Sequence, residues 1–391
     1  MALKSEISQP NLHDYHNQAL SKSRQIEAEA CSSIDLDSNP FLILLMGSTG
    51  TGKSRFIGVL SGNDMGISKD QLEPYTQDVI AYKISNLTHF GAPIYLVDTP
   101  GFSDPKLSEM RIVTKLHSWM SINSVDYFHH LFYFHRITDP RLSGSNARTM
   151  EIFRSLTGNG TSETVTVVTT MWDTLWRPEQ VRRAEARFNE LQKEYFKDWV
   201  EEGSKFAKFM NTQQSVLSIL AEHLKGSKPL DFNFERSQGA FPCHSLYADA
   251  LQRNLLERIS SLQKRLKSTT DDLQTALEDD ESMDLQNILK RQKRVIIEDI
   301  QTTLQDMDDY GHGLDIDTYR ADPEQIFSHL NTKYYPEIQE HLLAEATTYL
   351  LLLKVDDTAD EQSKGVIWSR YCERMRFLHI YNPTSYPSLH M

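Results

Sequence analysis

Short apolar runs alternate with amphipathic segments between about residues 40 and 225. Several runs are continuous enough to predict strands buried on both faces of a parallel sheet, at 41–46, 93–97, 131–134 and 164–168. Residues 79–84 predict a strand in a hairpin with 93–97, and residues 205–210 a last strand. Helices are expected at 54–60, 106–122, 147–156, 178–200 and 213–224. This alternation predicts an α/β, doubly wound and mostly parallel domain.

The apolar pattern changes to a helical period in the second half of the chain. One series starts at Leu255 and another at Leu285, and the acidic stretch 278–281 separates them. The spacings of three and four predict two long helices, which form either an antiparallel hairpin, a coiled coil or amphipathic helices packed on the first domain. Residues 323–355 predict further helix, and the proline-containing tail predicts loose order.

These patterns divide the chain into five segments. The expected segments are a polar N-terminal arm, flexible or partly helical, at 1–38; the α/β domain at 39–226; a linker at 227–242; a long helical or coiled-coil region at 243–312; and a helical segment with a loose tail at 313–391.

Charge and cysteine content exclude several classes of protein. Lys and Arg number 41 against 54 Asp and Glu, giving a net charge of −13, which argues against a nucleic-acid partner. The 3 cysteines have no CxxC spacing, so we expect neither a disulfide framework nor a zinc site. The N-terminus is unlike a secretory signal, the apolar run at 348–355 suits a buried helix, and no lipidation motif is evident. We therefore expect a cytoplasmic protein without evident membrane association.

A phosphate-binding loop follows the first apolar run. The pattern GxxxxGK[ST] lies between a predicted strand and a predicted helix, and its residues are Gly47, Ser48, Thr49, Gly50, Thr51, Gly52, Lys53 and Ser54. The glycines allow backbone N–H groups to turn inward around phosphate oxygens. The lysine is expected to reach the β- and γ-phosphates, and the serine hydroxyl to bind Mg²⁺.

A second motif, Asp98-Thr-Pro-Gly101, ends the strand at 93–97. We expect the Asp98 carboxylate to hold the Mg²⁺ hydration shell and the Gly101 N–H to meet the γ-phosphate. Between the two motifs, Thr76 is the expected threonine ligand of Mg²⁺, and Thr88, in the predicted hairpin turn, is the alternative.

Together these motifs resemble those of TRAFAC-class GTPases near the AIG1-type and septin-like group. The resemblance covers about residues 40–225 and rests on GxTGxGKS at 47–54, Leu-Ser-Gly at 60–62, DTPGF at 98–102 and VVTTMWD at 167–173. A group of fungal G-domain proteins is more similar still, sharing a YTxD-like segment and the HRITDPR loop at 135–141. The resemblance implies a G domain that binds GTP or GDP with Mg²⁺.

Base recognition departs from the NKxD pattern that the resemblance implies. The aligned residues run from Thr170 to Asp173, with Met171 in the place of the lysine. Asp173 is expected to accept the guanine N1 and N2 hydrogens, while Met171 covers the base. The alternative is that Asp173 only caps a turn.

Catalysis also departs from the common pattern, because Phe102 follows Gly101 where many GTPases carry a water-orienting glutamine. Slow hydrolysis is therefore expected, with Lys53, Thr76, Gly101 and Arg136 as the catalytic set. Arg136 is the preferred arginine finger, in cis or in trans; Arg141 is the second candidate, and both also suit surface positions.

The expected function is a slow, Mg²⁺-dependent GTPase that acts as a conformational or assembly switch. Its expected partner is a second copy, bound in a nucleotide-dependent way, or a helical protein, with the C-terminal helices as transmitter. The alternatives are a GTP-bound scaffold without hydrolysis and an ATPase of another P-loop class. Against the ATPase, no apolar strand ends in a paired Asp-Glu.

Overall fold

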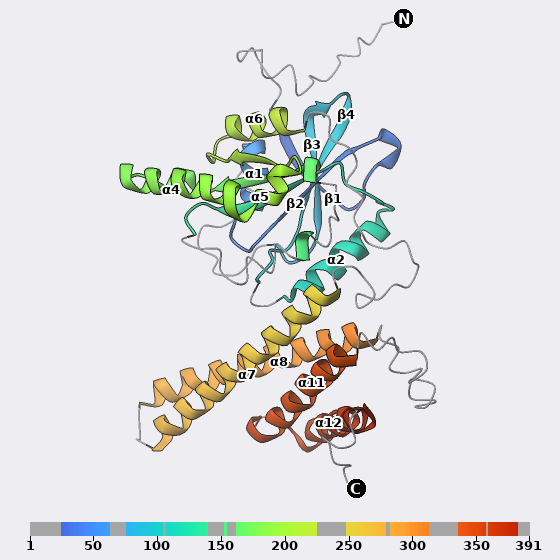
Figure 1. Ribbon diagram of the computed structural model, residues 1–391, viewed down its shortest axis with the longest axis vertical. Coiled ribbons are helices and arrows are strands. Elements are labelled where there is room, and N and C mark those ends of the chain that lie inside the picture. The colour runs from blue at the N-terminus through green and yellow to red at the C-terminus, as the bar shows by residue number, and fades with distance from the viewer. Residues whose placement is uncertain are drawn as a thin grey trace, which may run out of the picture. The chain divides into compact units, whose positions relative to one another are not determined.

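The computed structural model describes residues 25–62, 76–104, 107–139, 152–154, 162–224, 248–278, 282–312, 335–356 and 359–381. The chain divides into two compact units, Met1–Phe234 and Glu235–Met391 (Figure 1). Within these ranges, the fold is a mostly parallel mixed sheet with helices, followed by a helical C-terminal region, as the sequence predicts.

A seven-stranded sheet, in the order β1-β3-β4-β2-β5-β6-β7, organises the described residues of the first unit. The strands from β4 to β7 along this order pair in parallel, and β3 pairs antiparallel with both β1 and β4. The predicted hairpin of the strands at 79–84 and 93–97 is therefore confirmed. The strands are β1 (Glu27–Cys31), β2 (Phe41–Gly47), β3 (Ile80–His89), β4 (Ala92–Asp98), β5 (His130–Arg136), β6 (Val165–Thr170) and β7 (Lys205–Lys208).

Helices cover both faces of this sheet (Figure 1). The α-helices are α1 (Lys53–Ser61), α2 (Glu109–Ile122), α4 (Pro178–Glu190), α5 (Lys197–Glu201) and α6 (Gln213–His223). The shorter elements are the 3₁₀ helices η2 (Leu36–Ser38), η3 (Ser162–Thr164) and η4 (Trp172–Thr174), and the π-helix η5 (Leu191–Tyr195). The single helix predicted over 178–200 is thus divided into α4, η5 and α5. Of the helix predicted at 147–156, only 152–154 are described, and these are helical.

The apolar runs that predict the strands are buried on both sides. On one face, Ile43 and Leu45 of β2 pack in one cluster with Phe56 of α1 and Ile219 of α6. On the other face, Tyr133 of β5 contacts aromatic rings from outside the sheet, namely Phe153, Phe196 and Trp199. Two-sided burial fixes β2 in the centre of the sheet, so the loop after β2 is held by a rigid base.

Strand β1 corrects the expectation of a flexible or partly helical arm up to residue 38. Glu27–Cys31 pairs antiparallel with β3, from Glu27 opposite Ser85 to Cys31 opposite Ala81. The strand lies at the edge of the sheet and keeps much of its surface exposed. Its alternating Glu and Ala therefore carry little apolar signal, and pairing with β3, distant in sequence, makes it a strand.

The described residues of the second unit form two pairs of helices. They are α7 (Ala248–Glu278), α8 (Met283–His312), α11 (Tyr335–Val355) and α12 (Glu361–Tyr381). Helices α7 and α8 form the antiparallel hairpin that the sequence allows, since Gln286 donates to the Ala276 carbonyl at 3.3 Å and Arg258 to Thr303 at 3.3 Å. The predicted linker 227–242, the segment 323–334 and the tail from 382 lie outside the described residues.

Helix α12 is attached to its neighbours by buried charges. Arg374 donates to Glu345 of α11 at 2.6 Å and also pairs with Asp308 of α8. Arg374 is 3% exposed and Glu345 1%, so this network connects three helices inside the unit. Among the described residues, no helix is both long enough and apolar enough to cross a membrane.

Candidate functional site

The phosphate loop joins the end of β2 to the start of α1, as the sequence predicts. Gly50 and Gly52 have φ values of 77° and 91°, in the left-handed region that glycine adopts without strain. Gly47 is required for a second reason: a Cβ there would lie 2.4 Å from the carbonyl oxygen of Phe134 on β5. The loop is therefore pressed against the central strands and opens toward the carboxyl end of the sheet.

Lys53 spans the loop from its position at the start of α1. Its Nζ donates to the carbonyl oxygens of Gly47 at 3.0 Å and Ser48 at 3.3 Å. Burial lowers the pKa of Lys53, and the nearby carboxylates of Asp98 and Asp104 oppose this effect. The ammonium group thus lies at the loop, held by weak carbonyl acceptors that a phosphate oxygen can replace.

Three oxygen-bearing side chains from separate segments meet beside Lys53. Ser54 Oγ donates to Asp98 Oδ2 at 2.6 Å, and Thr76 Oγ1 donates to the same oxygen at 3.0 Å. The two hydroxyl oxygens are 3.0 Å apart. The structure therefore brings together the three residues that the sequence proposes as Mg²⁺ ligands, and Thr76 rather than Thr88 occupies this position; Thr88 lies in β3, opposite Pro93.

The donor set fits a magnesium ion. Asp98 is 0% exposed, and its Oδ1 has no hydrogen-bond partner. Burial raises the pKa of Asp98, while Lys53 and the hydrogen bonds from Ser54 and Thr76 oppose the rise. Mg²⁺ prefers hard oxygen ligands and retains water, so two hydroxyls, one carboxylate and phosphate oxygens suit it. Within the described ranges, no group of three His, Cys, Asp or Glu side chains offers another metal site.

The Asp98–Gly101 loop lies directly on the phosphate loop. Thr49 N–H donates to the Phe102 carbonyl at 2.9 Å, and Phe102 N–H donates to the Gly47 carbonyl at 3.1 Å. A Cβ on Gly101 would come within 2.3 Å of Thr49 Oγ1, so only glycine permits this approach. An isolated parallel bridge between Ser48 and Phe102 joins the two loops beyond the paired part of β2 and β4.

The side chain of Phe102 points into the core. It is 0% exposed, which removes it from any contact with attacking water. Asp104, two residues later, accepts a hydrogen bond from Thr49 Oγ1 at 3.2 Å. Asp104 is not among the residues predicted from the sequence; the available signal is its position three residues after Gly101, in a loop that contacts the phosphate loop.

Thr170 and Asp173 lie at the end of β6, beyond the phosphate loop. The Thr170 methyl group is 3.9 Å from the position of a Cβ on Gly52, so this residue contacts the loop. Asp173 accepts a hydrogen bond from Asn211 Nδ2 at 2.8 Å, and Asn211 Oδ1 accepts one from Arg55 Nε at 2.9 Å. Asn211 is a site residue that the sequence analysis misses.

The signal for Asn211 is weak, because it depends on position in the sheet. It follows β7, the last parallel strand, and has φ of 55° in a short connection to α6. Met171 has φ of 65° just before η4. These left-handed residues turn the two loops at the same end of the sheet, where Asp173 and Asn211 meet.

Arg136 lies at the end of β5 and extends over the phosphate loop. Its NH1 atom is 3.8 Å from the position of a Cβ on Gly50. Asp139 orients the guanidinium through an ion pair of 3.1 Å, and the side chain remains 41% exposed. The sequence-predicted arginine is thus adjacent to the phosphate loop of its own chain. Arg141 lies outside the described residues.

Comparisons with known proteins agree with this geometry at the level of the domain. A model of the 50S ribosome-binding GTPase family matches residues 42–169. The matched segment runs from β2 through β6 and contains the phosphate loop, Asp98 and Gly101. The first unit therefore contains a P-loop GTPase domain, a G domain. No curated protein matches the chain.

Solved structures of GTPases resemble parts of the chain at low identity. Toc33 from Arabidopsis thaliana, in complex with Mg²⁺ and GMPPNP, is 15% identical, with a TM-score of 0.39, covering 50% of this chain and 88% of that one. LeoA, a bacterial dynamin GTPase from ETEC, is 12% identical, with a TM-score of 0.32, covering 86% of this chain and 59% of that one.

Proposed function

We propose that the protein binds GTP with Mg²⁺ and hydrolyses it slowly, using the nucleotide state as a conformational or assembly switch. The observation that carries this proposal is the convergence of Ser54, Thr76 and Asp98 within 2.6–3.0 Å, next to the buried Lys53. Hydroxyl and carboxylate oxygens beside a lysine and a phosphate loop form the arrangement in which P-loop NTPases hold a metal–phosphate complex.

In the proposed complex, the loop N–H groups from Gly47 to Ser54 surround the phosphates and Lys53 contacts the β- and γ-phosphates. Ser54, Thr76 and Asp98 would hold Mg²⁺, which supplies charge neutralisation at the phosphate oxygens. Thr76 lies beside Ser54 and Asp98, and Gly101 rests on Thr49 of the phosphate loop. Loss of the γ-phosphate would release contacts with Thr76 and Gly101, which is the switch.

Guanine is the proposed base. The Asp173 carboxylate matches the N1 and N2 hydrogens of guanine, which adenine does not present together, and Asn211 orients it at 2.8 Å. Thr170 contacts the phosphate loop at Gly52. The Asp173 carboxylate is bonded to the Asn211 amide rather than to a backbone N–H of η4. This contact supports base recognition by Asp173 over a role as a helix cap.

Phe102 and Arg136 act in opposite directions on the proposed rate of hydrolysis. Phe102 is buried and supplies no group to orient water. Arg136 lies beside Gly50 in the same chain, which supports an arginine finger in cis. Such a finger contributes about 10³- to 10⁵-fold in rate by stabilising charge on the transferred phosphoryl group.

Three further parts of the proposal are supported by the sequence alone. The protein is related to the AIG1-type and septin-like group, it resides in the cytoplasm, and it assembles with a second copy or a helical partner in a nucleotide-dependent way. The rival functions are a GTP-bound scaffold without hydrolysis and an ATPase of another P-loop class.

Binding of a fluorescent GTP analogue, with and without Mg²⁺, tests the site. Lys53→Ala and Ser54→Asn each remove a charge-assisted contact, so we expect affinity to fall about 10- to 100-fold. Ser61→Ala is the matched control, because Ser61 is a buried serine of the same helix that bonds only to helix carbonyls. Unchanged affinity in both site variants contradicts the phosphate-loop assignment.

Competition among nucleotides tests base choice. Asp173→Asn should exchange GTP preference for XTP preference, and buried hydrogen-bond mismatches reach about 10⁴-fold. Stabilisation of the wild type by ATP alone would instead support the ATPase.

Single-turnover release of γ-phosphate separates the enzyme from the scaffold. A cis finger predicts a rate that does not depend on protein concentration and that Arg136→Ala lowers without weakening GTP binding. A rate that rises with concentration supports a finger in trans, and no release above the uncatalysed rate supports the scaffold.

A further inference from the structure

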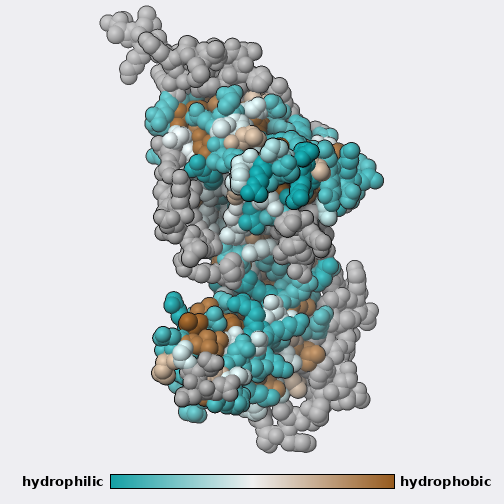
Figure 2. Space-filling model, turned by 90° about the vertical axis from the view of Figure 1, so that its left-hand side faces the viewer, coloured by the Kyte–Doolittle hydropathy of each residue, from teal (hydrophilic) through white to brown (hydrophobic). Residues whose placement is uncertain are grey.

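Helix α8 carries exposed apolar side chains, a second stripe outside the one packed in the helical unit. Ile296 and Ile300 are buried at 3% and 0% exposure, whereas Leu285, Ile288 and Val295 are 38%, 53% and 46% exposed. Ile288 and Val295 are seven residues apart, so they lie on one face of the helix. Figure 2, which looks toward the end of the hairpin, shows brown side chains gathered on the helical unit among teal ones. Exposed apolar side chains concentrated on one helix mark an interaction surface.

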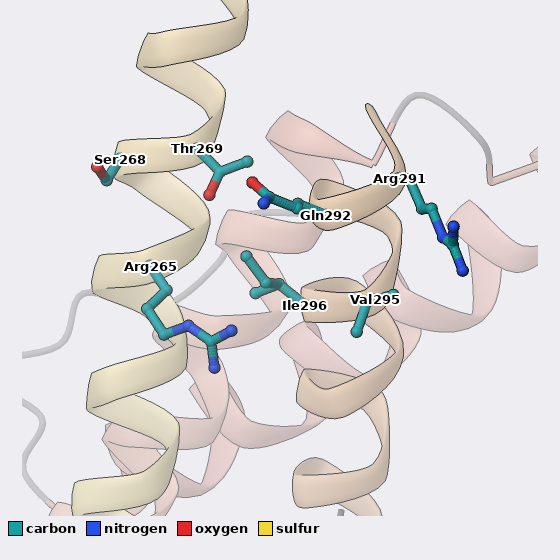
Figure 3. Close-up of a pocket in the computed structure, with 7 residues that line it drawn as sticks. All are labelled: Arg265, Ser268, Thr269, Arg291, Gln292, Val295 and Ile296. Carbon is teal, nitrogen blue, oxygen red and sulfur yellow. The ribbon is translucent and has the colours of Figure 1, made fainter. Parts of the chain in front are cut away.

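A hollow of about 410 Å³ accompanies this stripe in the groove between α7 and α8. Figure 3 shows Thr269 of α7 and Gln292 of α8 pointing toward each other across it, with Arg265 reaching in from α7. Val295 and Ile296 provide its apolar wall. The hollow can therefore accept an apolar side chain from a partner, with polar groups around its rim.

The charges along α8 change sign within the stripe. Asp284 lies in the first turn of α8, while Lys290, Arg291 and Arg294 follow about two to three turns later, and all four are exposed. An antiparallel copy of the same helix has the reverse order of charges. The stripe is thus complementary to itself in one direction only.

We propose that this stripe is an interface between two copies of the chain, formed by antiparallel packing of α8 on α8 about Ile288. This register places Asp284 of one copy opposite Gln292 of the other, about 1.5 Å along the axis from Arg291. Ile288 then meets Ile288 at the two-fold axis. This interface goes beyond the proposed function, because its formation does not require nucleotide binding.

The charges on α8 disfavour an anionic partner. A negatively charged membrane or nucleic acid would attract Arg291 and Arg294 but repel Asp284 on the same helix. A second copy satisfies both signs.

Sedimentation of the full chain over a range of concentrations, without nucleotide, tests this interface. The wild type should form dimers, and Ile288→Glu should weaken dimerisation about 10- to 100-fold because it buries a charge at the centre. Gln301→Glu is the matched control: it adds the same charge at an exposed position of α8 outside the stripe. Circular dichroism confirms that each variant keeps its helices.

A charge exchange tests the register. Asp284→Arg and Arg291→Asp should each weaken the dimer, and the two changes combined should restore it, because the pairs re-form with reversed signs. A wild type that stays monomeric up to about 100 μM overturns the proposal, as does a dimer that Ile288→Glu leaves intact.

Two further measurements distinguish failure of the interface from failure of GTP binding. If Lys53→Ala abolishes GTP binding but leaves the dimer, the interface stands without the switch; if the dimer fails while GTP binding persists, only the interface is wrong. Co-sedimentation with phosphatidylserine vesicles that Ile288→Glu abolishes would assign this face to lipid and overturn the proposal.

Discussion

Replacing Phe102 by glutamine tests whether residue 102 belongs to the core or to the catalytic apparatus. The change restores the residue type that many GTPases use to orient water. In this protein, however, the side chain is 0% exposed and its backbone is bonded to Gly47 and Thr49 of the phosphate loop. We therefore expect no gain in hydrolysis and a large loss of stability.

The size of the loss follows from burial. Removing a fully buried phenylalanine forfeits about 1.5–3 kcal/mol of transfer free energy. The glutamine amide would add about 1–3 kcal/mol for polar atoms that leave water without partners. The total of about 2.5–6 kcal/mol is a large part of the 5–15 kcal/mol that is typical of domain stability.

Urea unfolding, followed by near-ultraviolet signals of the first unit, measures this loss, and single-turnover phosphate release measures activity. Phe102→Leu is the control, because it keeps an apolar side chain and should cost clearly less. A Phe102→Gln variant that is destabilised by under about 1 kcal/mol, or that hydrolyses GTP faster, would refute the placement of residue 102 in the core.

Three further predictions concern buried charged or titratable groups. Asp98→Asn should raise the melting temperature of the nucleotide-free protein at neutral pH, because burial penalises the charged carboxylate, yet it should weaken Mg²⁺-dependent GTP binding. Burial lowers the pKa of His135 to about 4, so the folded state binds this proton less readily than the unfolded state. The free energy of unfolding should therefore fall by about 3 kcal/mol as the pH drops from 6.5 toward 4. His135→Gln should flatten this part of the dependence of stability on pH. Arg374→Met should cost about 3–5 kcal/mol, because Glu345 and Asp308 remain as buried, uncompensated charges.

Each of these predictions has its own contrary outcome. A lower melting temperature for Asp98→Asn would show that its hydrogen bonds outweigh desolvation. Parallel pH profiles for wild type and His135→Gln would show that other groups cause the acid sensitivity. Arg370→Met, at a side chain 43% exposed, is the control for Arg374, and equal costs in the two variants would contradict a buried network.

The sequence by itself determined the features that depend on local pattern. Continuous apolar runs predicted the central strands because a parallel strand is buried on both faces. The spacing of glycines, lysine and serine from Gly47 to Ser54 predicted the phosphate loop because its backbone shape is set by those residues alone. Spacings of three and four predicted α7 and α8, although not their antiparallel pairing.

Only the tertiary structure decided the features that join distant segments. The sequence favoured Thr76 over Thr88, but only the fold brings Thr76 into contact with Asp98 and Ser54. Phe102 follows a glycine in a loop, where sequence gives no side-chain direction; parallel pairing beyond β4 turns it inward.

The elements that the sequence missed share a physical cause. Strand β1 alternates charged and small residues, so it acquires its conformation from β3 rather than from its own apolar pattern. The role of Asn211 comes from a contact with Asp173 across 38 residues. Helix α12 has no regular apolar face, and the charged partners of Arg374 lie 29 and 66 residues away on α11 and α8. Local sequence determines the conformational preference of each residue. A hydrogen bond or ion pair between distant segments forms only when the chain folds and brings those segments together.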